Sequence, residues 1–229
     1  MNGLIFLLLF IICTGLIYIV HRYFGKHEFY LLAVIYSIIS FILSFKIINI
    51  FGLSINMSII FSSGLLMMLY YFINRYNYNE VKKYIIVIMI STICFEVFLL
   101  LGAIMLPSIY DENIVLLKEL IFSNFPIMII YPVGLLITLL LSSYSFKQLI
   151  EVKNNKIFKN TLALIGIIFI DVFVFIYFSY TIIINFSDSL SIAMDNYFIK
   201  IIIIIIMYFL INKLMKIKKV KAWIIFILH

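Results

Sequence analysis

Seven long apolar runs dominate this chain of 229 residues and restrict what it can fold into. They cover residues 3–20, 29–50, 57–73, 84–106, 126–149, 160–184 and 197–214. A helix that crosses a bilayer needs roughly 20 mostly apolar residues. Because lipid satisfies no backbone polar group, each run must form its own hydrogen bonds as a helix. The runs therefore predict one all-α integral membrane domain over residues 1–229, a polytopic bundle of about seven transmembrane helices.

Composition agrees with a membrane protein. Hydrophobic residues make up 66% of the chain and charged residues 12%, whereas soluble domains contain roughly 45–50% apolar and about 25% charged residues. The net charge of +7 does not indicate nucleic-acid binding, because the positive residues lie in short segments beside apolar runs. The first run is expected to be a retained helix rather than a signal peptide, since His21, Arg22 and Lys26 follow it.

Lys and Arg alternate between the two sides of the predicted bundle. Connecting segments on one side hold 14 of the 17 positive residues, and those on the other side hold only Lys118. The remaining two, Lys46 and Lys200, lie inside predicted spans. Cytoplasmic segments carry the excess of positive residues in membrane proteins. The pattern predicts a multi-pass protein of the cell membrane with its N-terminus outside and its C-terminus in the cytoplasm.

Two segments outside the predicted spans are expected to form an external loop and a cytoplasmic tail. Residues 107–125 are expected to form an external loop, and their apolar residues predict an interfacial helix within it. Residues 215–229 are expected to form a basic cytoplasmic tail.

Four ionisable residues fall within the predicted spans, and their depth separates them. Lys46 and Lys200 are expected within about a turn of the outer ends, where their long side chains can reach water. Glu96 and Asp171 are expected near the centres, where a charge costs at least roughly 2.5–3.5 kcal/mol. Each of these two carboxyl groups either faces a polar cavity that binds substrate or carries a proton, or is buried in neutral or hydrogen-bonded form.

No motif of an enzyme is found in the chain. It has no P-loop, no nucleophile elbow, no HExxH and no CxxC sequence. Its three histidines and two cysteines show no metal-ligand spacing. We therefore expect no catalytic activity, no metal and no cofactor.

Several short motifs occur in an order that points to a known family. Residues 21–54 read HRYFGKHEFYLLAVIYSIISFILSFKIINIFGLS, with an FGK motif, Lys46 and an FGL turn. Later, KNTLALIGIIFID contains Asn160 and Asp171, and DNYFIK contains Asn196, Tyr197 and Lys200. In this order, over about residues 20–220, the chain resembles the queuosine precursor transporters, also described as vitamin-uptake-like transporters.

The resemblance implies a helical membrane transporter without an ATP-hydrolysing domain. It would import a small heterocyclic precursor of this tRNA modification, a 7-deazaguanine such as preQ0, preQ1 or queuine. Asp171 would accept hydrogen bonds from the ligand, and Lys200 would supply positive charge or pair with Asp171. Asn160 and Tyr197 would be secondary contacts. Glu96 and Lys46 complete the candidate substrate-binding residues. The expected partners are this substrate and the lipid bilayer, and a homo-oligomer is left open.

The chain also departs from the family at polar positions. The residues that stand there are Phe41, Leu43, Tyr70, Asn74, Leu139, Ser142, Ile168 and Met207. Two further functions therefore stay open. The first is a substrate-binding membrane subunit that needs a separate energising complex. The second is a non-transporting membrane scaffold derived from a transporter.

Overall fold

The computed structural model describes residues 2–104, 114–151 and 157–216. Its helices are α1 (Asn2–Tyr23), α2 (Lys26–Leu43), α3 (Ile59–Arg75), α4 (Tyr78–Ile104), α5 (Ile114–Ser123), α6 (Phe125–Glu151), α7 (Ile157–Val172), the π-helix η1 (Phe173–Tyr177), α8 (Phe178–Thr181) and α9 (Phe186–Lys216). In this described part of the chain, six helical stretches are long and apolar enough to cross a membrane, and α3 is a shorter apolar helix. The predicted all-α polytopic bundle is confirmed.

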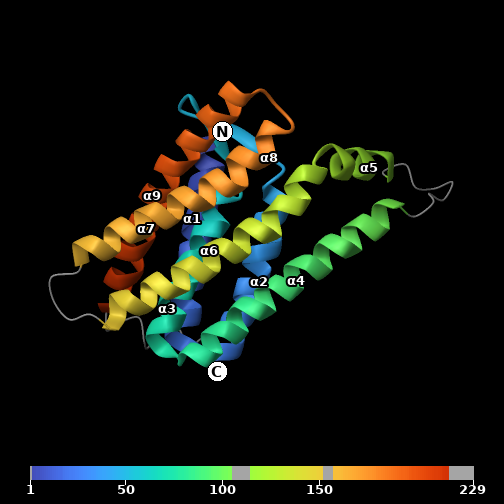
Figure 1. Cartoon of the computed structure of the whole chain (residues 1–229). Helices are drawn as coiled ribbons and strands as arrows, with labels where there is room; N and C mark the ends of the chain where they lie inside the picture. Colours follow the sequence, from blue (N-terminus) through green and yellow to red (C-terminus); the bar gives the residue numbers. More distant parts are fainter. Residues whose placement is uncertain (1, 105–113, 152–156, 217–229) are drawn as a thin grey trace.

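Helix α3 lies at the centre of the bundle and packs against α1, α2, α6 and α9 (Figure 1). Almost every side chain from Ile59 to Phe72 is buried, which explains why this helix is apolar on all sides. The packing is close at Gly64, where a Cβ atom would lie 2.8 Å from Cys13 Sγ and 2.9 Å from Tyr36 Cε2. Only glycine fits there without displacing α1 or α2.

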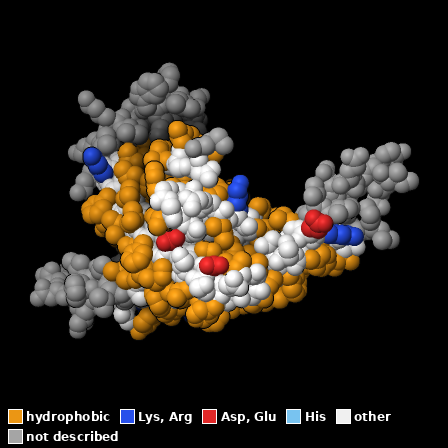
Figure 2. All heavy atoms as spheres, turned by 90° about the horizontal axis from the view of Figure 1, so that it is seen from above, with side chains coloured by type: hydrophobic (Ala, Val, Ile, Leu, Met, Phe, Trp, Pro, Cys, Tyr) orange, Lys and Arg blue, Asp and Glu red, His pale blue; other side chains and the backbone are white. Residues whose placement is uncertain are grey.

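The outer helices present one apolar face to the surroundings and another to the core. On α4 the exposed face is formed by Ile86, Ile90, Ile93, Val97 and Leu101. These residues recur at helical spacing, as expected for a stripe in contact with lipid. Figure 2 shows hydrophobic side chains over much of the end of the molecule that it views, with few charged groups.

A β-hairpin replaces the end of the second predicted span. Helix α2 ends at Leu43, and β1 (Ile47–Ile50) pairs antiparallel with β2 (Leu53–Asn56). The two turn residues, Phe51 and Gly52, have φ angles of 53° and 85°, as in the tight turns that match strand twist. The prediction of a helix to residue 50 is therefore wrong. Lys46 is exposed between α2 and β1 rather than inside a span.

The hairpin is completed by side chains of α9. Asn196 accepts a hydrogen bond from the Asn56 backbone N–H (2.9 Å) and donates one to the Ser54 carbonyl (3.1 Å). Asp195 accepts from the Ser54 N–H (2.8 Å). Together these two side chains bind the free edge of β2 as a third strand would, so its backbone groups are satisfied.

Helix α9 is longer than its apolar run. It begins at Phe186, so Lys200 lies about four turns from the start of the helix. The expectation that Lys200 reaches the outer surface from a helix end is therefore wrong. A helix predicted within residues 107–125 is present as α5, whereas most of the predicted tail lies outside the described residues.

Several positively charged segments meet at one end of the bundle. Arg75 donates hydrogen bonds to the carbonyls of His21 (2.7 Å) and Phe24 (3.1 Å). Lys26 forms an ion pair with Glu80 (3.3 Å). These contacts put the α1–α2 and α3–α4 connections side by side, in agreement with the alternation of charge along the sequence. Which side of the membrane they face stays a prediction.

Candidate functional site

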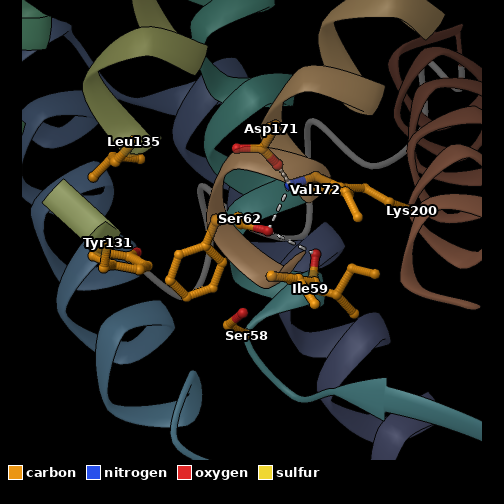
Figure 3. Close-up of a pocket in the computed structure, with 10 residues that line it drawn as sticks. Ser58, Ile59, Ser62, Tyr131, Leu135, Asp171, Val172 and Lys200 are labelled. Atoms are coloured by element: carbon orange, nitrogen blue, oxygen red, sulfur yellow. Dashed lines mark hydrogen bonds and ion pairs between the residues drawn. The ribbon is translucent and has the colours of Figure 1, made fainter. Parts of the chain in front are cut away.

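A buried ion pair joins two helices in the interior of the bundle. Lys200 on α9 contacts Asp171 Oδ2 near the end of α7, with exposed side-chain fractions of 3% for the lysine and 13% for the aspartate. Lys200 Nζ also donates to Ser62 Oγ on α3 (2.9 Å). Thr138 on α6 donates to Asp171 Oδ1 (2.5 Å). Four helices thus converge on one pair of opposite charges, as the sticks in Figure 3 show in part.

Such a pair is costly to bury. Taking both charges from water costs several kcal/mol per ion, and the mutual attraction offsets this only when hydrogen bonds complete the geometry. Here Ser62 and Thr138 provide those bonds. A hydrophobic pair of similar volume would often be as stable. Charged groups at such positions in membrane proteins usually mark substrate or ion pathways, so the arrangement identifies a candidate binding site.

A small cavity adjoins the ion pair. It has a volume of about 20 Å³, close to what a single water molecule requires. Its walls are formed by Ser58, Ile59, Ser62, Tyr131, Leu135, Asp171, Val172, Phe175, Ile176 and Lys200 (Figure 3). Pockets for drug-sized ligands measure roughly 300 Å³ or more. The cavity beside the ion pair is therefore too small for such a ligand in this structure.

The backbone beside the pair departs from regular helix geometry. The π-helix η1 begins two residues after Asp171 and supplies Phe175 and Ile176 to the cavity wall. Opposite it, a Cβ atom on Gly134 of α6 would lie 3.4 Å from Phe175 Cβ, and Pro132 interrupts the hydrogen bonding of the same helix. Single π-turns inside helices occur frequently at functional sites. Interrupted helices also surround the binding sites of many transporters.

The second predicted carboxyl group, Glu96, lies on the inward face of α4. It is 7% exposed, and its Oε1 atom has no hydrogen-bond partner among the described residues. It does not line the cavity. Tyr131 of α6 does line it, and α6 packs against both α4, which carries Glu96, and α7, which carries Asp171.

Three other predicted residues are not brought to the pair. Tyr197 is half-buried and packs its ring against Phe169, with centroids 5.6 Å apart. Asn160 lies on α7 about three turns, or roughly 16 Å, before Asp171, and its side chain is outside the described residues. Lys46 is exposed beside the hairpin. Tyr197 and Lys46 do not line the cavity, and the role of all three residues in binding stays a prediction.

The hydroxyl groups of the site were not singled out by the sequence. Ser58 is the residue before α3 and Ser62 lies in its first turn, four residues later. Thr138 interrupts the aliphatic stretch LLITLLL. A hydroxyl at helical spacing inside an apolar run is the available signal. It does not select these residues, because serine and threonine are common between packed membrane helices.

Comparisons with known proteins do not assign a function to this site. No protein-family model, curated protein or solved structure matches the chain. Within residues 2–104, 114–151 and 157–216, no group of three or more His, Cys, Asp or Glu side chains could hold a metal ion.

Proposed function

We propose that this chain is a multi-pass transporter of the cell membrane that takes up a small heterocyclic compound. The substrate class is a 7-deazaguanine precursor of queuosine, such as preQ0, preQ1 or queuine. Residues 20–220 support this class through their resemblance to that transporter family. The proposed orientation has the N-terminus outside and the C-terminus in the cytoplasm, as the distribution of Lys and Arg favours.

The observation that carries the proposal is the buried pair of Asp171 and Lys200 beside a cavity. A carboxylate accepts two parallel hydrogen bonds, and the edge of a guanine-like ring offers two neighbouring N–H groups. The substrate would replace Lys200 on Asp171. The released ammonium group, still held by Ser62, would donate to the ring carbonyl. The pair thus keeps both charges satisfied when the site is empty and offers both to the ligand.

Loading the substrate requires the bundle to open, because the cavity holds about 20 Å³. The π-helix η1 and the segment of α6 around Pro132 face each other at the cavity. We propose that movement between them admits the ligand. A ligand that binds the open form more tightly shifts the population toward it.

Uptake of labelled preQ1 and queuine tests the proposal in cells that lack their own transporter and synthesis route. Asp171→Asn should reduce uptake at least about tenfold, since hydrogen bonds to a charged group contribute roughly 1.5–3 kcal/mol each. Asp188→Asn is the matched control, because that carboxylate is exposed at the start of α9. It should transport like the wild type at equal expression.

The other outcomes separate the remaining hypotheses. A well-expressed wild-type chain that takes up neither compound would contradict the substrate class. Uptake only when the chain copurifies with an ATPase would identify a subunit of a larger complex. Unchanged uptake in both Asp171→Asn and Lys200→Met would remove the ion pair from the site. If no transport of any heterocycle is found and both variants keep their fold, the chain is a scaffold.

A further inference from the structure

Glu96 is a buried carboxyl group that the ion pair does not use. It belongs to the inward face of α4 together with Ile85, Ile88 and Thr92, opposite the lipid-facing stripe. Its Oε1 atom lacks a partner among the described residues. Thr92, one turn earlier, cannot donate to it, because its hydroxyl proton is bonded to the Ile88 carbonyl (2.8 Å).

Among the described residues, no cation forms an ion pair with Glu96. On the helices packed against α4, the titratable charged residues in terminal turns are Lys26, His27, Glu28, Arg75, Lys147 and Glu151, whereas Lys118 and Glu119 lie in the middle of α5. On α4 itself, Glu80, Lys82 and Lys83 lie in the first two turns. The buried cation Lys200 is already bound to Asp171. A buried charge without a partner costs several kcal/mol. A neutral, protonated Glu96 avoids this cost.

Aromatic packing runs from the cavity through Tyr131 toward the helix that carries Glu96. The Tyr131 hydroxyl donates to the Ser37 carbonyl (3.2 Å), and its ring packs against Phe41 and Phe175 at centroid distances of 5.4 and 5.1 Å. Phe175 belongs to the π-helix beside Asp171. Phe41 in turn packs against Phe95, the residue before Glu96 on α4, with centroids 6.2 Å apart. Movement of η1 or α6 would change the surroundings of Glu96 and of the ion pair together.

We infer that Glu96 is a proton-binding site coupled to the Asp171–Lys200 pair across Tyr131. When the bundle opens, the O–H bond of the Glu96 carboxyl group breaks and the proton passes to water. The bonding electrons stay on the carboxylate. Only the role of this site in transport rests on the proposed function. If Glu96 is protonated in the closed form and ionised in an open form, a proton gradient can drive uptake.

Infrared titration of the purified full chain tests the site without any substrate. The C=O stretch of a neutral carboxylic acid should be present at neutral pH in the wild type. It should disappear in Glu96→Gln and persist in the control Asp188→Asn. A neutral-acid band that is absent from the wild type, or unchanged in Glu96→Gln, would overturn the inference.

Coupling predicts that removal of Asp171 and removal of Lys200 shift the pH at which the Glu96 band is lost in opposite directions. Asp171→Asn leaves Lys200 as an uncompensated positive charge, which favours ionised Glu96, so the band should be lost at lower pH than in the wild type. Lys200→Met leaves a negative charge on Asp171, and the Glu96 band, identified by its loss in the Lys200→Met, Glu96→Gln double variant, should persist to higher pH. The Coulomb interaction between Glu96 and the remaining charge sets the direction of each shift. Shifts of the same sign, or none, would contradict coupling.

Transport assays distinguish a failure of this inference from a failure of the proposed substrate class. With a transported 7-deazaguanine, Glu96→Gln should still exchange labelled for unlabelled substrate but lose accumulation driven by a pH gradient. Retained gradient-driven accumulation would exclude Glu96 as the coupling group. If the wild type transports none of these compounds, the substrate class fails, while the infrared results still decide whether Glu96 binds a proton.

Discussion

At the scale of single residues, removing one charge of the Asp171–Lys200 pair should destabilise the fold more than removing both. Lys200→Met leaves Asp171 buried with only Thr138 as a partner, and removing one partner of a buried pair typically costs about 3–5 kcal/mol. Asp171→Leu combined with Lys200→Met removes both charges and should recover most of that loss. Thermal unfolding in detergent measures the difference.

The double variant also separates fold from function. It should unfold near the wild-type temperature yet take up no substrate, because the carboxylate that would bind the ligand is gone. A double variant as unstable as Lys200→Met would show that the helices do not tolerate an apolar pair at this position. A stable double variant with normal uptake would assign the pair a structural role only.

At the scale of elements, the hairpin should depend on α9. Asn196→Leu removes the bonds to the Asn56 N–H and the Ser54 carbonyl, and each buried group left unsatisfied costs about 1–3 kcal/mol. The amides of residues 53–57 should then exchange hydrogen for deuterium faster, by roughly tenfold or more. The neighbouring Tyr197→Phe is the control and should leave this exchange unchanged. Equal exchange in all three proteins would refute the role of Asn196.

The helices could be predicted from the sequence, but the hairpin and the site could be predicted only in part. Apolar length decides the helices because lipid leaves the backbone no other partner. The segment IINIFGLSIN is also rich in apolar residues, and a short run of this kind does not distinguish strand from helix. Asp171 was found because a carboxylate inside a span is rare. Thr138, which binds Asp171, and Ser62, which binds Lys200, come from other helices. Only the packing of these helices brings the two hydroxyl groups to the ion pair.

At the scale of the whole molecule, the two ends of the bundle should lie on opposite sides of the membrane. Phe51, at the hairpin turn, is 97% exposed, and Asn77 is exposed between α3 and α4 at the other end. In a chain without Cys13 and Cys94, Phe51→Cys should react with an impermeant thiol reagent on intact cells. Asn77→Cys should react only after permeabilisation. The reverse pattern would invert the proposed orientation.

The bonds from α9 to the hairpin have a consequence for biogenesis. The ribosome delivers residues 53–56 about 140 residues before Asp195 and Asn196, the partners of their free edge. Asp171 likewise emerges before Lys200. Until α9 is inserted, a nascent chain therefore holds an open strand edge in the hairpin and a buried carboxylate without its lysine. Insertion of α9 satisfies both at once, so it is the step at which quality control can distinguish a chain with these contacts from one without them.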